Sequence, residues 1–101
     1  MKIYPISVPR KPYRGRNDSM RRKVAQYNDD AAVLEEYLNE RIEADPAPVQ
    51  EYLYGFIARD VGMSVARVTE ILFGVDCGHN GLTVAKSAEA WQKFINGPHG
   101  N

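Results

Sequence analysis

Apolar residues recur at helical spacing along much of the chain, and the longest such stripe lies in its first half. Its members follow one another every three or four residues: Met20, Val24, Tyr27, Ala31, Leu34, Leu38 and Ile42. This spacing predicts an amphipathic helix. In one helix over residues 19–44 the basic triplet Arg21–Lys23 would lie at the positive end of the helix dipole, which is unfavourable. Because Asn28-Asp29-Asp30 offers new N-caps, we predict a break there and a main helix from about Asp30 to Ala44.

Two further helices are predicted after Asp45-Pro46-Ala47-Pro48, whose prolines end the first one. A second helix is expected from near Pro48 to Asp60, followed by Gly62 as a residue able to take positive φ. Its apolar stripe consists of Val49, Leu53, Phe56 and Ile57. Ser64 is expected to cap a third helix that ends at Gly74. The inward residues of this helix would be Val65, Val68, Ile71 and Leu72.

The last part of the chain changes character. Val75–Ala85 contains Asn80-Gly81 between short apolar runs, which predicts a small β-hairpin. Cys77 would be a strand residue packed against the core. Ser87 is expected to cap a final helix. Its apolar face would comprise Ala88, Trp91, Phe94 and Ile95, with Trp91 completing the core.

Length and composition indicate one small soluble domain. The chain has 101 residues, of which 44% are hydrophobic and 26% charged. No apolar run approaches a membrane span, and prolines and arginines interrupt the first sixteen residues where a secretory signal would be apolar. With Cys77 as the single cysteine, an internal disulfide is excluded. We therefore expect a cytoplasmic protein without export or membrane association.

The net charge of zero conceals two regions of opposite sign. Residues 1–28 contain eight basic residues and one acid, a net charge of +7, whereas the remainder contains five basic residues and twelve acids, a net charge of −7. Prolines and a glycine disfavour regular structure before residue 18. We therefore predict a basic, largely disordered N-terminal arm (1–28), a folded domain (29–97) and a disordered tail (98–101). Such an arm either contacts a polyanion or is merely solvated.

A helix-turn-helix resemblance lies in the segment Tyr54–Phe73. Counted from Tyr54, a small residue, Ala58, stands at the fifth position and Gly62 at the ninth, and the stretch FIARDVGMSVARVTEIL contains no misfit. Apolar residues flank both positions: Ile57, Val61, Met63, Val68 and Ile71. The segment resembles the bacterial helix-turn-helix family, although any amphipathic helical hairpin meets part of this pattern. The resemblance implies a mainly α fold, a helix-turn-helix bundle of about four helices with a small β-hairpin wing after the recognition helix.

This resemblance also implies roles for residues of the third helix, which would enter the major groove. The candidates for base readout are Ser64, Ala66, Arg67, Thr69 and Glu70. Arg67 would bond guanine, Thr69 a base or phosphate and Glu70 cytosine, while Ala66 would contact a thymine methyl group. The alternative is a solvent-facing helix on which Arg67 and Glu70 form an ordinary ion pair.

Contacts to the DNA backbone or minor groove are expected mainly from the arm. Its candidates are Arg10, Lys11, Arg14, Arg16, Arg21, Arg22 and Lys23, and the folded part adds Arg59, His79, Asn80 and Lys86. Arg14-Gly15-Arg16 is similar to the core of minor-groove hooks, but Asn17 stands where those hooks carry proline. For His79 and Asn80, a role in the turn is the alternative explanation.

The expected function is that of a small DNA-binding protein, a transcriptional or phage or plasmid regulator, with no cofactor and no enzymatic activity. Cys77 and His79 are too few for a zinc site, and no phosphate-cradling glycine loop occurs. A homodimer is possible if the stripe from Met20 to Ile42 forms the seam, although a buried core helix explains this stripe equally well. The alternative function is an acidic winged-helix adaptor or inhibitor that binds another protein.

Overall fold

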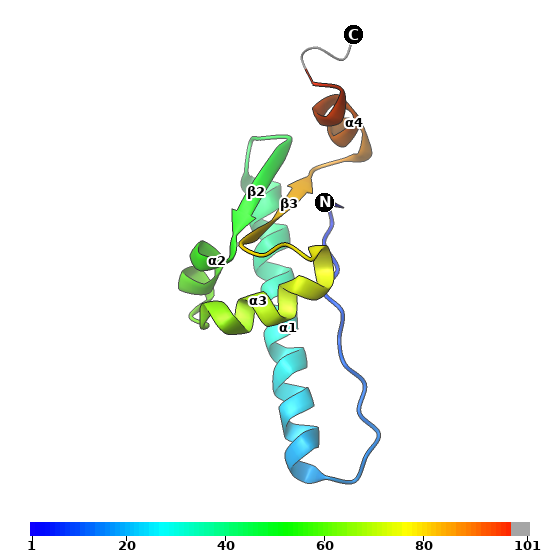
Figure 1. Ribbon diagram of the computed structural model, residues 1–101, viewed down its shortest axis with the longest axis vertical. Coiled ribbons are helices and arrows are strands. Elements are labelled where there is room, and N and C mark those ends of the chain that lie inside the picture. Colours follow the sequence, from blue (N-terminus) through cyan, green and yellow to red (C-terminus); the bar gives the residue numbers. More distant parts are fainter. Residues whose placement is uncertain (98–101) are drawn as a thin grey trace.

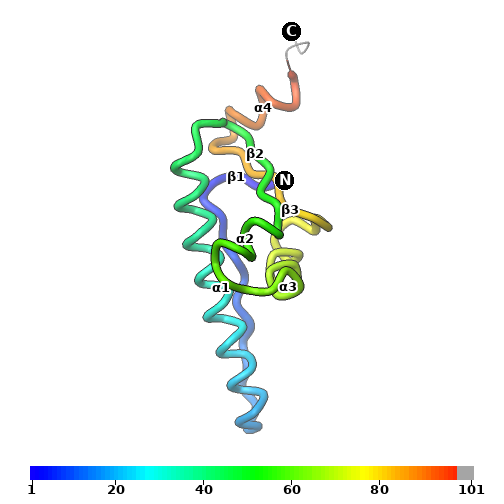
Figure 2. Tube along the Cα trace, turned by 90° about the vertical axis from the view of Figure 1, so that its left-hand side faces the viewer, coloured from blue at the N-terminus to red at the C-terminus, as the bar shows by residue number. Residues whose placement is uncertain are grey.

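The computed structural model describes residues 1–97, which form a mainly α fold with four helices and a small sheet (Figure 1). The elements in chain order are β1 (Lys2–Ile3), α1 (Asp18–Ala44), β2 (Val49–Leu53), α2 (Tyr54–Val61), α3 (Val65–Asp76), β3 (Gly81–Ala85) and α4 (Ala88–Asn96). The tail predicted at 98–101 lies outside the described residues. Figure 2 shows α1 along the length of the molecule, with the N-terminal segment beside it.

The sheet has the strand order β1-β3-β2. β3 pairs antiparallel with β2, so that Tyr52 lies opposite Leu82, and parallel with β1. The core lies between this sheet, α1, α2 and α3. Its largest fully buried side chains are Tyr54, Leu34, Leu38, Ile42, Ile57, Ile71, Leu72, Leu82, Val8, Val68 and Val84. The stripe of α1 is therefore core packing, and its buried part is not a free dimer seam.

The N-terminal segment is ordered, and the prediction of a largely disordered arm over 1–28 is wrong. Ile6 is 4% exposed and Val8 is 2% exposed, and both belong to the main core. Residues 18–28 are the first part of α1. The predicted boundary between residues 28 and 29 therefore falls inside a helix, and arm and body form one unit.

α1 is continuous, which corrects the predicted break at Asn28-Asp29-Asp30. Asn17 caps it, accepting a hydrogen bond from the Met20 N–H at 3.1 Å. The polar side chains at the expected break have other partners: Asn28 bonds the backbone of Lys11, and Asp30 bonds Arg67. Because these tertiary contacts occupy the side chains that would cap a second helix, the backbone stays helical.

The second predicted helix is partly wrong, because Val49–Leu53 forms β2 and α2 begins only at Tyr54. The apolar residues 49, 53, 56 and 57 match helical spacing, but Tyr52 is buried against β3. The predicted end is confirmed: Gly62 has a φ of 73° and follows α2 directly.

The hairpin predicted over Val75–Ala85 does not form. Val75 and Asp76 are the last residues of α3, which runs past Gly74, and β3 pairs with β2 and β1. Cys77 is exposed and ends α3 with a φ of 50°, so it is not a core strand residue. The N-caps predicted at Ser64 and Ser87 are confirmed. Trp91, however, is only half-buried, and α4 has no buried residue.

Candidate nucleic-acid interface

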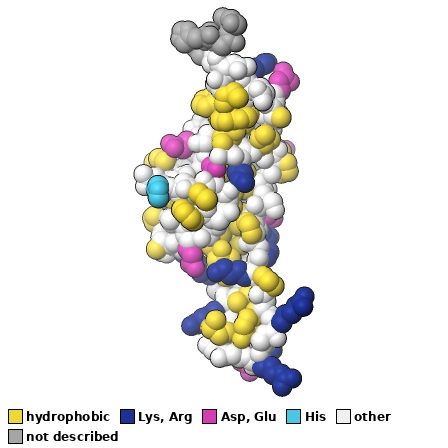
Figure 3. Space-filling view, turned by 45° about the vertical axis from the view of Figure 1, so that its right-hand side comes forward, with side chains coloured by type: hydrophobic (Ala, Val, Ile, Leu, Met, Phe, Trp, Pro, Cys, Tyr) yellow, Lys and Arg dark blue, Asp and Glu magenta, His cyan; other side chains and the backbone are white. Residues whose placement is uncertain are grey.

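One end of the molecule is strongly basic, and we call it the basic tip. It consists of the first turns of α1 and the loop before them, with Arg10, Lys11, Arg14, Arg16, Arg21, Arg22 and Lys23. All seven residues are exposed. Figure 3 shows Lys and Arg side chains gathered at this lower end. The cations predicted for the arm are therefore brought together on a protruding part of the fold.

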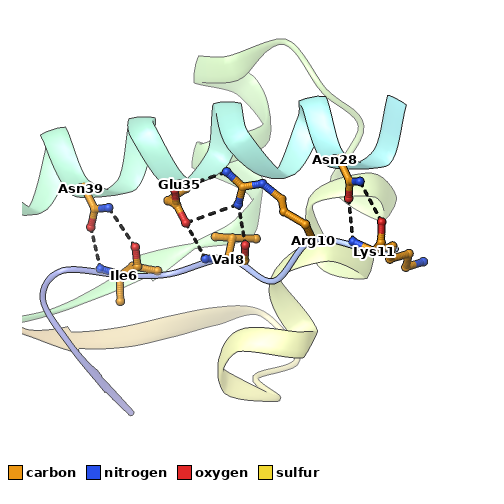
Figure 4. Close-up of polar contacts among 7 residues, drawn as sticks. All are labelled: Ile6, Val8, Arg10, Lys11, Asn28, Glu35 and Asn39. Atoms are coloured by element: carbon orange, nitrogen blue, oxygen red, sulfur yellow. Dashed lines mark hydrogen bonds and ion pairs between the residues drawn. The ribbon is translucent and has the colours of Figure 1, made fainter. Parts of the chain in front are cut away.

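The tip is positioned by a ladder of hydrogen bonds from α1 to the extended segment (Figure 4). Asn39 accepts from the Ile6 N–H at 2.7 Å and donates to the Ile6 carbonyl at 2.9 Å. Asn28 repeats both bonds, at the same two distances, with the backbone of Lys11. Between them Glu35 accepts from the Val8 N–H at 2.8 Å. The ladder satisfies backbone groups that have no strand neighbour there.

Glu35 also fixes the first cation of the segment. Arg10 reaches its carboxylate at 3.4 Å and donates to the Val8 carbonyl at 2.5 Å. The bond from the Val8 N–H, followed by that from Arg10, lowers the pKa of Glu35. Because Arg10 is paired in this way, it contributes less free positive charge than the other tip residues.

The outer loop of the tip is organised by Tyr13 and Arg21. The Tyr13 ring covers Gly15 so closely that an added Cβ would lie 2.4 Å from the Tyr13 hydroxyl. Arg21 pairs with Asp18 at 3.7 Å and donates to the Gly15 carbonyl at 3.4 Å. Within residues 1–97 no ion pair involves Arg14, Arg16, Arg22 or Lys23. These four cations are available to an anionic partner.

A cleft of about 340 Å³ joins the basic tip to α3. It is lined by Lys11, Met20, Lys23, Val24, Gln26, Tyr27, Arg67 and Glu70. The Lys11 ammonium lies 3.9 Å from the centre of the Tyr27 ring, and the Arg67 guanidinium lies 5.2 Å from it. Tyr27 thus places two cations, one from the arm and one from α3, on the same concave surface.

Arg67 is the most constrained of the predicted base-reading residues. Its Nε donates to Asp30 at 2.9 Å and its Nη1 donates to Glu70 at 3.1 Å, while its side chain is 26% exposed. The bond to Asp30 raises the pKa of Arg67. The side chain therefore joins α3 to α1, and a bidentate contact to guanine requires it to leave Asp30.

The other predicted reading residues differ in accessibility. The Ser64 Oγ accepts the Arg67 N–H at 3.1 Å, so it serves the helix cap, while Ala66 and Glu70 are exposed. Thr69 lines an apolar hollow of about 380 Å³ between α2 and α3. Leu53, Phe56 and Val65 also line the hollow and are respectively 38%, 55% and 53% exposed. The outward side of α3 is consequently more apolar than basic.

The remaining predicted backbone contacts do not join the basic tip. Arg59, His79 and Asn80 line the same hollow as Thr69. Lys86 follows β3 on the side that leads to α4, and its N–H bonds the Pro48 carbonyl at 2.9 Å. The expected DNA contacts thus separate into the basic tip, the α2–α3 surface and the isolated Lys86.

Sequence reasoning missed the residues that hold the tip in place. Asn28, Glu35 and Asn39 are separated by seven and four residues, so they share one face of α1. This polar stripe beside the apolar one is a signal that the sequence carried. The spacing of Tyr27 indicates only the apolar stripe, and nothing in that spacing distinguishes the ring contacts with Lys11 and Arg67.

Within residues 1–97, no three His, Cys, Asp or Glu side chains gather as a metal site. In the same residues, no helix has both the length and the apolar character that a bilayer crossing requires. Comparisons of the chain with models of protein families, with curated proteins and with solved structures find no match.

Proposed function

We propose that this protein binds double-stranded DNA, with the basic tip on the phosphates and α3 directed at the major groove. The observation that carries the proposal is the basic tip: Arg14, Arg16, Arg21, Arg22 and Lys23 are exposed at the end of a narrow protrusion, and exposed Lys11 and Arg10 follow along α1 beside Asn28 and Glu35. Clustered Lys and Arg release condensed counterions when they neutralise phosphates, which drives association without sequence preference.

The electrostatics of α1 support this proposal. Arg21, Arg22 and Lys23 lie in the first turns of the helix, where the dipole is positive. The effect of the dipole falls off beyond the first turn, so each of these cations costs less than the roughly 0.3–1 kcal/mol of a cation within it. A polyanion relieves this cost, so binding is favoured beyond the simple attraction of the side chains.

The position of α3 gives the protein a second element, next to the basic tip, that could contact DNA. α2 and α3 are joined by the short turn 62–64, and the Tyr27 cleft connects α3 to the tip. We infer that α2 and α3 act as a helix-turn-helix. Exposed Ala66 and Glu70 would then approach the base edges while the tip binds the phosphate backbone of the DNA. Arg67 takes part only when it exchanges Asp30 for a base.

The test is a mobility-shift titration against a random duplex pool at two salt concentrations. The triple variant Arg14→Ala/Arg16→Ala/Arg22→Ala is expected to weaken binding to all sequences and to reduce the salt slope by about 3. The matched control removes three cations that lie away from the tip and are not among the expected DNA contacts, Lys2, Arg41 and Lys93. No shift for the unaltered protein at low salt, or equal losses for both triple variants, contradicts the proposal.

The apolar hollow favours a second function, binding of another protein by an adaptor. Phe56 and Val65 are more than half exposed, and contiguous apolar surface of this kind is typical of protein interfaces. Val65→Asp separates the two functions because Val65 lies in the first turn of α3. If α3 enters the groove, the new carboxylate repels phosphate and DNA binding falls. If α3 instead serves a protein partner, the basic tip binds DNA as before.

A further inference from the structure

β2 is an edge strand of the sheet. Within residues 1–97 the strand order β1-β3-β2 places β3 on one side of it and no strand on the other (Figure 1). Three of its five residues, Gln50, Glu51 and Leu53, are exposed. An exposed edge presents unpaired N–H and carbonyl groups, with which an extended chain can pair. The backbone of β2 is therefore open to a hydrogen-bonding partner.

The pairing with β3 shows which backbone groups of β2 are free. Tyr54 continues the ladder, and its N–H donates to the Asn80 carbonyl at 2.8 Å. Bonded and non-bonded pairs alternate along an antiparallel ladder, so the even-numbered residues of β2 bond β3 and the odd-numbered residues point their backbone groups away from it. Within residues 1–97 the N–H groups of Val49 and Glu51 have no acceptor, and the Glu51 carbonyl accepts only from the adjacent Gln50 side chain, at 3.2 Å. We call these outward groups the free edge of β2.

A cleft of about 600 Å³ lies beside the free edge. It is lined by residues 50–53 of β2 and by side chains of α1 and α2, among them Asp45 and Asp60. The Tyr52 hydroxyl donates to Asp45 at 2.7 Å, so the face of β2 that carries Gln50 and Tyr52 is turned toward α1 and the cleft. Because alternate side chains of a strand point to opposite faces, a strand added at the free edge would direct every second side chain into the cleft.

The cleft carries more acid than base. It is lined by three acids and two bases, a net charge of −1: Asp45, Glu51, Asp60, Arg41 and Arg59. Both arginine side chains are more than half exposed, whereas those of Asp45 and Asp60 are less than a third exposed, so the two aspartates lie deeper. The C-terminal end of α1, where the helix dipole is negative, also borders the cleft. The cleft therefore favours a cationic side chain.

We propose that the free edge of β2 binds an extended segment of another protein, which joins the sheet as an antiparallel strand and places lysine or arginine side chains in this cleft. Residues of the segment opposite Val49 and Glu51 would bond the backbone of β2. Residues opposite Gln50 and Tyr52 would turn their side chains into the cleft and their own N–H groups away from β2. The recognised segment therefore carries its basic residues at alternate positions.

A second copy of β2 fits the free edge less well. Antiparallel pairing of two β2 strands over their whole length places the two copies of Glu51 directly opposite each other, because Glu51 is the central residue. Like charges in that position destabilise a sheet. The side chains that a second copy would bring to the cleft, Gln50 and Tyr52, carry no positive charge. The inference does not depend on DNA binding, because β2 lies away from the basic tip (Figure 1).

The test uses the full chain and a short, fluorescently labelled synthetic peptide of alternating lysine and valine residues, without nucleic acid. Fluorescence anisotropy should show saturable binding with a dissociation constant of about 100 µM or tighter. A peptide with glutamate in place of lysine should bind about tenfold more weakly or worse. With lysines in the cleft, the valine amides face β2, so their N-methylation should abolish binding, whereas N-methylation of the lysine amides should be tolerated. No saturable binding, or equal losses from the two methylations, overturns the proposal.

Two variants at one position test the same edge from the side of the protein. Glu51→Pro removes the outward N–H at the middle of β2 without removing a bond to β3, and edge strands tolerate proline. It should weaken binding of the lysine peptide about tenfold or more. The matched control Glu51→Ala removes the same charge but keeps the N–H, so it should weaken binding less. Equal losses from the two variants, with both folded by circular dichroism, overturn backbone pairing.

The cleft and the choice of partner have separate tests. Asp60→Asn keeps an acceptor for the Tyr37 hydroxyl but removes a charge, so it should reduce the preference for the lysine over the glutamate peptide. An unchanged preference overturns the role of the cleft. Sedimentation velocity of the unaltered chain, with Glu51→Pro alongside, examines self-association. A dimer that Glu51→Pro dissociates would assign the free edge to a second copy and overturn the proposed partner.

Discussion

The hydrogen bonds from Asn28 and Asn39 to the N-terminal segment allow a quantitative prediction about what holds this segment to α1. Asn39→Ala removes two hydrogen bonds to the backbone of Ile6, at 2.7 and 2.9 Å, in a partly buried setting. Two such bonds contribute about 1–3 kcal/mol together, and their loss leaves an N–H and a carbonyl poorly satisfied. Alanine recovers roughly 0.5 kcal/mol because it is a better helix former than asparagine. We expect a net loss of about 1–2 kcal/mol.

Asn28→Ala is the matched control. Asn28 makes the same two bonds, at 2.7 and 2.9 Å, to the backbone of Lys11, but in an exposed setting. Water replaces these bonds, while the gain in helix propensity is the same as at position 39. We therefore expect Asn28→Ala to change the free energy of unfolding by less than about 0.5 kcal/mol. The difference between the changes in unfolding free energy of the two variants therefore measures the effect of burial on these hydrogen bonds.

Urea denaturation followed by circular dichroism measures both free energies of unfolding by linear extrapolation. A loss at Asn28 equal to that at Asn39 would show that burial does not decide the contribution of the ladder. No loss at either position would show that the segment is not bound to α1. Asn39→Asp keeps an acceptor for the Ile6 N–H but replaces the donor to the Ile6 carbonyl by a carboxylate oxygen. Because the ionised carboxylate repels that carbonyl oxygen, the loss of stability should be smaller at a pH where the carboxyl is protonated than near neutral pH.

Three further predictions concern the same region. Glu35→Gln should cost about 1 kcal/mol at pH 7. Because the pKa of Glu35 is lowered from 4.5, the loss of unfolding free energy should be present in full above pH 4.5 and should disappear as the pH falls through the lowered pKa. Urea titrations of both proteins at several pH values measure this difference. Ile6→Ala should cost about 2–5 kcal/mol in the same assay, whereas Ile3→Ala, at a side chain that is 41% exposed, should cost much less. Asp30→Ala releases Arg67 from its ion pair, so it should lower stability yet raise affinity in the mobility-shift assay, and unchanged affinity would remove Arg67 from the readout residues.

Local signals in the sequence were sufficient to predict several helix ends correctly. Ser64 and Ser87 cap helices because a hydroxyl before an apolar repeat can accept the third N–H, and Gly62 ends α2 because it tolerates positive φ. These outcomes depend on residues within one turn of each other. The two cations on Tyr27 come from segments far apart in sequence, so no local pattern indicates them.

The incorrect expectations concern segments whose partners are distant in the chain. Val49–Leu53 is a strand because its backbone pairs with β3, about thirty residues later, where Tyr52 lies opposite Leu82 and Gln50 opposite Val84. The N-terminal segment is ordered because Asn28, Glu35 and Asn39 bond its backbone from a helix that follows it. Its composition alone is that of a disordered arm. A polar stripe beside the apolar stripe of a helix can therefore indicate hydrogen bonds to the backbone of an extended segment.

The opposite charges of tip and body are compatible with DNA binding because the fold separates them. Arg22 and Glu43 lie near opposite ends of α1, about 30 Å apart at 1.5 Å per residue. The Debye length at physiological ionic strength is about 8 Å, so exposed acids at the far end act only weakly on phosphates at the tip. The net charge of zero therefore does not govern association, and the local charge of the tip does. It follows that removing acids from the far half of α1, such as Glu40 and Glu43, should change DNA affinity at physiological salt far less than removing Arg14 and Arg16. Comparable effects would mean that the whole-molecule charge controls binding.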